Sequence, residues 1–319
     1  MTGRTTSSDS ETLWASAPLI LDAAIGTAPD SAITVAIAAA QPNLSLVLTS
    51  DESAGRRARL ARHLLDLLGR TDVRVVAGRE LGGETIWTAG DSIPAETIIE
   101  NGGVSAAVES VLSRHNGQVS WVGLGPMSNL ADLLSTNPEV GPRLAVTQAC
   151  GGTHVSPTLA ERNIALDISA AHTVISSGIQ LTIVTSTVAV FILNTETVDT
   201  TGYRILARST NPISVLLRSQ MDQWFAQFGP YSDQHGPMTL AVALGADFIE
   251  TEPANIELDS VGRMHTGGQP VTLAHHVNYV ALGHWFTHQL AEIERYGVVR
   301  YHRTPRIGQL DPRAQQGRQ

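Results

Sequence analysis

The chain has no lysine and only one cysteine, Cys150, among its 319 residues. Without lysine, neither a Schiff-base mechanism nor a P-loop that binds phosphate through lysine is possible. With one cysteine, the chain can form no intramolecular disulfide and no metal site made of several thiolates. This cysteine usage is typical of a protein from a reducing compartment.

Long hydrophobic runs are also missing. The longest apolar stretches, residues 32–40 and 181–193, are too short to span a bilayer or are interrupted by threonine. The first residues, MTGRTTSSDSET, are polar and lack the apolar core of a signal peptide. We therefore expect a soluble, cytoplasmic protein that does not bind a membrane.

The charge balance of the chain argues against one class of partner, nucleic acids. The formal net charge is −9, and an acidic surface argues against nucleic acid as the main partner, because phosphate binding requires a basic face. Hydrophobic residues make up 42% of the chain and charged residues 16%, so a large core can form. Global disorder is not expected.

Short apolar runs alternate with helical patterns along most of the chain. The runs predicted to be strands are residues 19–24, 44–49, 73–78, 118–125, 143–149 and 180–186. They are β-branched and apolar on both faces, as buried parallel strands are. The helical patterns between them, such as 53–69 and 103–114, imply right-handed βαβ units. We expect an α/β fold with a mostly parallel central sheet, helices on both faces and a Rossmann-like core.

The expected organisation is a flexible N-terminus over residues 1–17, a single domain over 18–300 and a polar C-terminal tail over 301–319. In the last third of the chain, helices are predicted at 212–228, 237–247 and 281–295. The Gly- and Pro-rich segment FGPYSDQHGP, between the first two of these helices, is expected to be a mobile loop.

Ligands of a parallel α/β sheet gather at the carboxyl ends of its strands. This rule selects the loops at 22–31, 124–129, 149–163 and 185–187. In the first loop, Asp22 and Asp30 are candidates for a general base or for hydroxyl recognition. The alternative is structural: Asp22 would hold loop amides, and Asp30 would cap the next helix. Asn129 is a candidate ligand-binding residue of the second loop.

The segment GGTHVSPTLAERNIALD, residues 151–167, is a long polar loop that concentrates His154, Glu161, Arg162 and Asn163. A connection of this length inside a compact domain is usually functional, although a solvated surface loop is the alternative. We include these side chains among the candidate substrate-binding residues.

His235 stands just before the helix expected to begin at Pro237 and is a candidate general acid, although a single histidine is more often structural. Trp224, Phe228 and Tyr231 precede it. They fit an aromatic lid over a flat ligand, but the spacing of the first two equally fits the buried face of a helix.

Four of these segments together resemble the nucleoside hydrolase family, the inosine-uridine-preferring N-ribohydrolases. LILDAAIGTAPDSAI resembles the family's D-x-D-x-G-x-D-D-x-A loop, and VGLGPMSNLADLL its G-P-L-T-N segment. The segment that begins at Cys150 resembles the M-G-G…A-E-F-N…D-P-E-A-A region, and HGPMTLAVAL resembles H-D-P-x-A-V-A. The similarity covers roughly residues 18–295.

The resemblance implies a calcium ion at the bottom of the pocket that holds two ribose hydroxyls and the attacking water. It also implies an aspartate base from the first loop, an acid for the leaving base, and a homodimer or homotetramer. Asp22 matches the aspartate that supports the loop, and Asp30 matches one that binds a ribose hydroxyl. Glu161 and Asn163 match sugar-binding residues, and His235 matches the histidine of the last motif.

The sequence departs from the family at the calcium ligands. Ala24, Ser31 and Gly236 stand where the family has aspartates, and only the main-chain carbonyl of Leu124 remains. Since Ca²⁺ takes about six to eight oxygen ligands, we expect no metal and no other cofactor. Arg162 replaces a phenylalanine of the family and could meet a phosphate or carboxylate, or pair with a surface acid.

Three functions remain open. The first is a metal-independent enzyme that acts on a ribosyl, nucleoside-like or other polar heterocyclic substrate, with Asp22, Asp30 or Glu161 as base and His235 as acid. The second is a non-catalytic ligand-binding or scaffold protein. The third is an ordinary calcium-dependent N-ribosyl hydrolase.

Overall fold

The computed structural model describes residues 17–82, 86–90, 93–99, 102–152, 158–190 and 194–301, with side chains as far as Arg295. The expected N-terminal segment 1–17 and C-terminal tail 301–319 therefore lie almost entirely outside the described residues.

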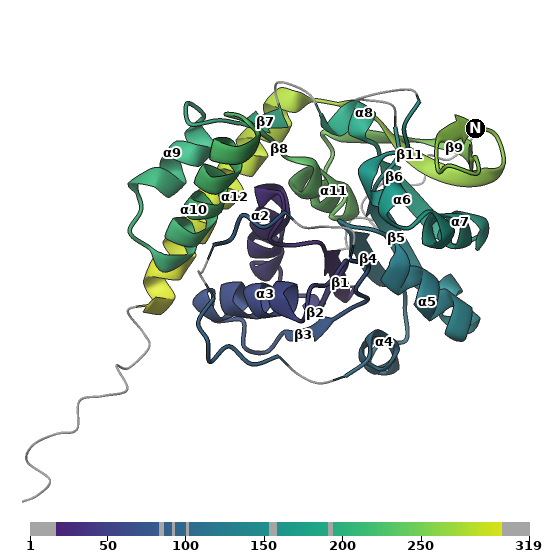
Figure 1. The fold of residues 1–319 in the computed structure, drawn as a ribbon, viewed down its shortest axis with the longest axis horizontal. Helices are drawn as coiled ribbons and strands as arrows, with labels where there is room; N and C mark the ends of the chain where they lie inside the picture. The colour runs from purple at the N-terminus through teal and green to yellow at the C-terminus, as the bar shows by residue number, and fades with distance from the viewer. Residues whose placement is uncertain are drawn as a thin grey trace, which may run out of the picture.

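Within the described residues, nine strands form one sheet in the order β10-β9-β11-β6-β5-β4-β1-β2-β3 (Figure 1). Their bounds are β1 Leu19–Ala23, β2 Leu44–Thr49, β3 Arg74–Ala77, β4 Val119–Gly123, β5 Leu144–Ala149, β6 Gln180–Val184, β9 Ile249–Leu258, β10 Met264–Thr266 and β11 Gln269–Val277. Neighbours from β11 to β3 are parallel, whereas β9 runs antiparallel to β10 and β11. The predicted mostly parallel sheet is confirmed.

Successive side chains of the central strands point to opposite faces of the sheet and enter two hydrophobic cores. Leu19 and Leu21 of β1 join a core with residues of α2, α3, α10 and α12, whereas Ile20 joins a second core with residues of α4, α5 and α7. All five residues of β1 are buried, because helices cover both faces. The predicted helical layers on the two faces are thus confirmed (Figure 1).

The described helices connect the strands. Their bounds are α2 Pro29–Ala39, α3 Arg56–Leu67, α4 Val104–Ser113, α5 Ser128–Thr136, α6 Arg162–Leu166, α7 Ile168–Ser176, α8 Ser186–Ala189, α9 Thr201–Arg208, α10 Pro212–Phe228, α11 His235–Ala243 and α12 Tyr279–Tyr301, with a 3₁₀ helix at Pro138–Arg143. The sequence pattern located α3, α4 and α10 to within three residues, whereas α12, expected at 281–295, ends six residues later.

The structure differs from the sequence-based expectations at three places in the second half of the chain. The helix expected at 237–247 begins two residues earlier, at His235, and ends at Ala243. The segment expected to be a mobile loop contains β8 (Ser232–Asp233), which pairs with β7 (Thr195–Glu196). The sequence pattern also misses the hairpin β9–β11, because most of β9 is exposed or half-buried and so shows no apolar run.

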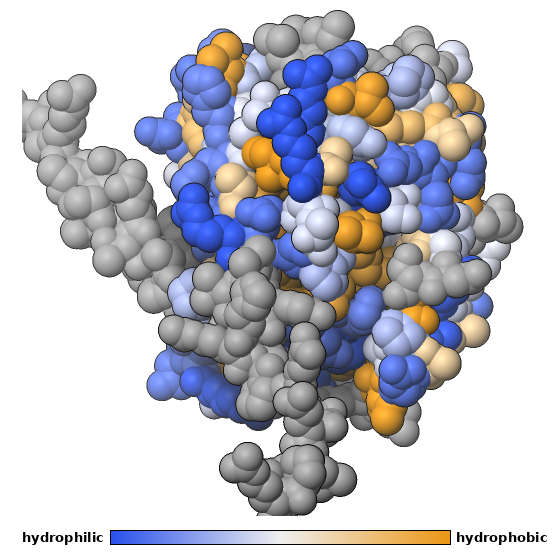
Figure 2. All heavy atoms as spheres, turned by 90° about the vertical axis from the view of Figure 1, so that its left-hand side faces the viewer, coloured by the Kyte–Doolittle hydropathy of each residue, from blue (hydrophilic) through white to orange (hydrophobic). Residues whose placement is uncertain are grey.

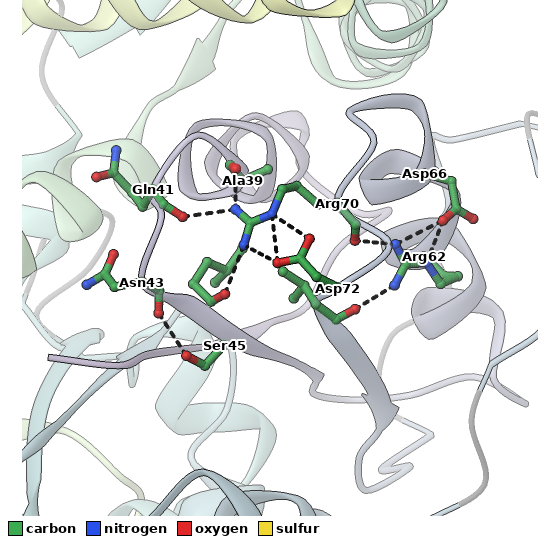
Figure 3. A network of polar contacts seen from close by, with 10 residues as sticks. Ala39, Gln41, Asn43, Ser45, Arg62, Asp66, Arg70 and Asp72 are labelled. Carbon is green, nitrogen blue, oxygen red and sulfur yellow. Dashed lines mark hydrogen bonds and ion pairs between the residues drawn. The ribbon is translucent and has the colours of Figure 1, made fainter. Parts of the chain in front are cut away.

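A polar network fixes the edge of the sheet where the strands begin (Figure 3). The guanidinium of Arg70 donates to the carbonyl oxygens of Ala39 at 2.6 Å, Gln41 at 2.9 Å and Leu44 at 3.1 Å. Arg70 also forms an ion pair with Asp72 at 2.9 Å. One side chain thus joins the end of α2, the start of β2 and the approach to β3.

The face on the left of Figure 1, where α9 and α10 lie, is turned to the viewer in Figure 2. Its coloured atoms are mainly hydrophilic, and the hydrophobic residues are scattered among them rather than gathered in one broad patch. Among the helices that the structure describes, none combines the length and apolar character needed to cross a membrane.

Candidate active site

Residues that follow β1, β2, β4 and β5 line a cavity of about 240 Å³. This edge of the sheet is the one that a parallel α/β topology assigns to ligands. Six of the side chains selected from the sequence line it: Asp30, Glu161, Arg162, Asn163, Trp224 and His235. Segments that are far apart in the sequence therefore meet at one site.

The three positions that depart from the family pattern, Ala24, Ser31 and Gly236, also lie on this cavity, and so does Leu124, whose main-chain carbonyl fits the pattern. The wall at these positions offers a methyl group, a hydroxyl group, an apolar side chain and a residue without a side chain. The first loop keeps its place in the site but contributes little charge at these positions.

Asp22 and Asn129, expected to be a catalytic and a ligand-binding residue, do not line the cavity. Asp22 is 2% exposed, and its two carboxylate oxygens accept from Asn129 Nδ2 at 3.1 and 3.2 Å. The same nitrogen donates to the carbonyl of Thr49 at 3.1 Å. Burial raises the pKa of Asp22 to about 7, although the contact with Asn129 opposes this. The pair ties β1, β2 and α5 together, which favours the structural interpretation.

Asp30 lies in the first turn of α2, after the N-cap residue Ala28, and so does not cap the helix as the alternative interpretation expected. Its Oδ2 accepts the N–H of Gly236 at 2.9 Å and joins α2 to the start of α11. Burial raises the pKa of Asp30 to about 6, and the nearby charge of Asp233 adds to this shift. Asp30 is therefore both a wall of the cavity and a link between two helices.

Glu161 and Asn163 are held by the backbone around them. Glu161 is the N-cap of α6, and its Oε2 accepts the N–H groups of Asn163 at 3.0 Å and Ile164 at 3.3 Å. Asn163 Nδ2 donates to the carbonyl of Ala149 at the end of β5, at 2.7 Å. Burial raises the pKa of Glu161 to about 7. The segment predicted as a long loop thus ends in a short helix that presents these two side chains.

Arg162 lines the cavity, which favours the ligand-facing interpretation over an outward surface pair. Burial lowers the pKa of its guanidinium, while the charges of Asp51 and Asp30 oppose this shift. The fourth candidate of this segment, His154, lies outside the described residues.

His235 lines the cavity, but its geometry does not suit the expected general acid. Its Nε2 lies 2.8 Å from the carbonyl oxygen of Val184, so this nitrogen carries the proton and donates it to the backbone. Burial lowers the pKa of the imidazole. The ring is therefore neutral near pH 7, and its N–H is already engaged. In this geometry the Nε2 proton of His235 is not available to a leaving group, and the general-acid role stays a prediction.

The three candidate aromatic residues do not form a common lid. Only Trp224 lines the cavity; Phe228 and Tyr231 are 41% and 53% exposed. The ring of Phe228 packs on Trp224 with centroids 4.4 Å apart, and Trp224 Nε1 donates to the carbonyl of Tyr231 at 3.0 Å. The outer pair therefore supports the one indole that reaches the site.

Three charged residues of the site, Asp51, Arg57 and Asp233, were not selected from the sequence. All three line the cavity, and the first two form an ion pair at 3.7 Å. Arg57 also donates from Nη1 to the carbonyl of Ile25 at 2.7 Å and to Thr27 Oγ1 at 3.0 Å. Asp51 follows the end of β2 by two residues. Its place at the carboxyl end of a parallel strand is the sequence signal that points to it.

Comparison with known proteins agrees with the observed fold. Residues 19–293 match the family described as inosine-uridine preferring nucleoside hydrolase. A pyrimidine-specific ribonucleoside hydrolase, RihA of Escherichia coli O8 (strain IAI1), is 26% identical over 284 residues, which cover 78% of this chain and 86% of RihA.

Solved structures show the same fold. The plant nucleoside hydrolase PpNRh1 superimposes with a TM-score of 0.74 at 19% identity, over 86% of this chain and 99% of that one. The type III effector XopQ, solved in complex with adenosine diphosphate ribose, gives a TM-score of 0.69 at 18% identity, over 91% of this chain and 100% of that one. The family match, which spans nearly all of the described residues, shows that this chain belongs to the nucleoside hydrolase family.

Proposed function

We propose that the cavity binds a ribosyl or similarly polyhydroxylated ligand and that the chain acts on it as an enzyme without a calcium ion. The observation that carries the proposal is the meeting of Asp30, Glu161 and Asn163 on one cavity whose remaining wall includes Ala24 and Gly236. Carboxylate and amide oxygens accept hydrogen bonds from hydroxyl groups. The names of the ribonucleoside hydrolase RihA and of the XopQ complex with adenosine diphosphate ribose support a ribosyl ligand.

The side chains present do not fit a calcium ion. Ala24 and Gly236 offer no side-chain oxygen, and Ser31 offers an uncharged one. A Cβ atom at position 236 would lie 2.4 Å from Thr34 Oγ1, so an aspartate has no room there unless Thr34 moves. The described residues also contain no group of three or more His, Cys, Asp or Glu that could hold a metal. Calcium is therefore not assigned to this site.

Buried carboxyl groups supply the acid–base chemistry. The pKa of Glu161 is raised to about 7 and that of Asp30 to about 6, mainly by burial. Groups that titrate close to the working pH can both accept and donate protons. In N-glycosidic cleavage, such groups would orient the hydroxyls of the sugar and deliver a proton to the departing base.

A non-catalytic binding protein is the second candidate. Asp30 and Glu161 both accept hydrogen bonds from backbone N–H groups, a structural role that requires no reaction. Binding of a ribosyl ligand without release of ribose would favour this candidate. Ribose release that a chelator abolishes would favour the calcium-dependent hydrolase.

Titration calorimetry with D-ribose, inosine and uridine tests the proposal. We expect binding whose dissociation constant is the same in a chelator and in added calcium. Asp30→Asn keeps an acceptor for the N–H of Gly236 but loses the charge that faces a hydroxyl, so binding should weaken about tenfold, since a hydrogen bond to a charged group contributes roughly 1.5–3 kcal/mol. Asp132→Asn, which alters a largely exposed carboxylate outside the cavity, serves as control. Binding only in the presence of calcium would contradict the proposal.

A further inference from the structure

The ionisable side chains on the cavity carry an excess of negative charge. Four carboxyl groups and two guanidinium groups line it: Asp30, Asp51, Glu161, Asp233, Arg57 and Arg162. The imidazole of His235 is neutral near pH 7, because burial lowers its pKa. A ligand in this cavity therefore meets more acidic than basic groups.

Two of these six groups neutralise each other inside the wall. Asp51 and Arg57 are 2% and 1% exposed and form an ion pair at 3.7 Å. The guanidinium of Arg57 also donates to the carbonyl oxygens of Asp51 and Ile25, each at 2.7 Å. Because this pair is enclosed and its charges are opposite, the net charge that a ligand meets comes from the remaining four groups.

These four groups, three carboxyl groups and one guanidinium, leave the cavity negative at neutral pH. Burial raises the pKa of Asp30 to about 6 and that of Glu161 to about 7, so at about pH 7.5 both are more than half ionised. The charge of Asp233 contributes to the shift of Asp30, which places these two carboxyl groups near each other. Arg162 offsets only one of the three negative charges. The cavity therefore favours a cationic group over an anionic one.

Asp233 is the carboxylate best placed to meet a cationic group. It is half-buried on β8 rather than enclosed, and its Oδ1 accepts from Thr195 Oγ1 on the paired strand β7 at 3.0 Å. Asp30 is only 9% exposed, and its Oδ2 accepts the N–H of Gly236. Glu161 Oε2 accepts three backbone N–H groups. Asp30 and Glu161 therefore suit fixed contacts with the sugar, whereas Asp233 leaves a fixed, accessible charge beside them.

An aromatic ring lies on the same cavity. Trp224 lines it, and its Nε1 donates at 3.0 Å to the carbonyl of Tyr231, two residues before Asp233. The ring of Phe228 packs on the indole with centroids 4.4 Å apart. The hydrogen bond and this packing fix the orientation of the indole. The face of an indole attracts cations and stacks on planar rings, so Trp224 and Asp233 together fit a planar cation.

We propose that the cavity selects a ribosyl ligand whose planar heterocycle is positively charged at the nitrogen bonded to the ribose, and that Trp224 and Asp233 receive this heterocycle. This inference rests on the proposed function. When such a ligand is hydrolysed, the bond from the anomeric carbon to the ring nitrogen breaks, and its electron pair neutralises the nitrogen. The oxygen of a water molecule bonds to the anomeric carbon, and one proton of that water passes through a carboxylate to solvent. Ribose, the neutral heterocycle and a proton are the products. The leaving group needs no proton, in agreement with the engaged Nε2 proton of His235.

Calorimetry with two C-ribosides tests the inference. N-methylpyridinium and toluene, each joined to β-D-ribofuranose by a carbon–carbon bond at the meta position, have the same shape, differ in charge and have no nitrogen leaving group. With chelator present, we expect the wild-type protein to bind the cationic riboside at least about tenfold more tightly than the neutral one, through the indole face and the carboxylate. Asp233→Asn should remove most of this preference and leave the affinity for the neutral riboside nearly unchanged, because the amide oxygen can still accept from Thr195.

Asp132→Asn is the matched control, because it removes one negative charge from a largely exposed side chain outside the cavity. It should keep the wild-type preference for the cationic riboside. The inference is overturned if the wild-type protein binds the neutral riboside equally or more tightly, or if Asp233→Asn keeps the full preference. Tighter binding of ribose 5-phosphate than of D-ribose would also overturn it, since Arg162 would then set the charge preference. If neither the C-ribosides nor D-ribose bind, the proposed function itself fails.

Discussion

Replacement of Arg70 by methionine should lower the free energy of unfolding by about 3–5 kcal/mol, because each buried carbonyl left without its donor costs roughly 1–3 kcal/mol. Three carbonyl oxygens, on Ala39, Gln41 and Leu44, accept from this guanidinium, and Arg70 is only 7% exposed. Methionine fills a similar volume, so the loss reports the hydrogen bonds rather than a cavity. Urea unfolding followed by circular dichroism gives the measurement.

Arg204→Met is the matched control for this substitution. Its ion pair with Asp199 joins side chains that are 54% and 85% exposed, and an exposed pair of this kind contributes less than about 1 kcal/mol. We expect the control to unfold at nearly the same urea concentration as the wild type. Equal, small effects of the two substitutions would show that the network in Figure 3 is not needed for stability.

The second large effect is on the pH dependence of stability. Burial raises the pKa of four carboxyl groups above their ordinary range: Asp22 to about 7, Asp30 to about 6, Glu161 to about 7 and Glu196 to about 7. In the folded state each of these groups holds a proton that the unfolded chain has already released. The free energy of unfolding should therefore fall as pH rises from about 4.5 to 7, by up to about 1.4 kcal/mol per pH unit for each group.

Glu196→Gln isolates one of these groups outside the cavity. Glu196 Oε2 accepts the N–H of Tyr203 at 2.8 Å and a hydroxyl proton from Thr200, and the amide oxygen of glutamine can accept both. The variant should match the wild type near pH 4.5 and exceed its free energy of unfolding by up to about 3 kcal/mol at pH 8. His235, whose pKa is lowered, gives an opposite slope in both proteins, which cancels in the comparison. Parallel stability curves would contradict the expectation.

Much of the fold follows from the sequence alone. A strand buried on both faces must be apolar throughout, so β1, β2, β4 and β5 stand out as short hydrophobic runs. The alternation of such runs with amphipathic helices then leaves a parallel sheet as the expected arrangement. The exposed hairpin β9–β11 could not be predicted in this way, because its strands have no continuous buried face.

The candidate site, like the fold, was predicted only in part from the sequence. The sequence located the loops that carry it, because the carboxyl ends of parallel strands meet at one edge, and Asp30, Glu161 and Asn163 do meet there. Which side chain of a loop faces the cavity was decided only by the tertiary structure. The side chain of Asp22, on β1, accepts a hydrogen bond from Asn129 and does not line the cavity. Asp51 has a left-handed backbone conformation, contacts Arg57 and does line the cavity. The direction of a side chain at the end of a strand depends on backbone angles and distant partners, which local sequence does not encode.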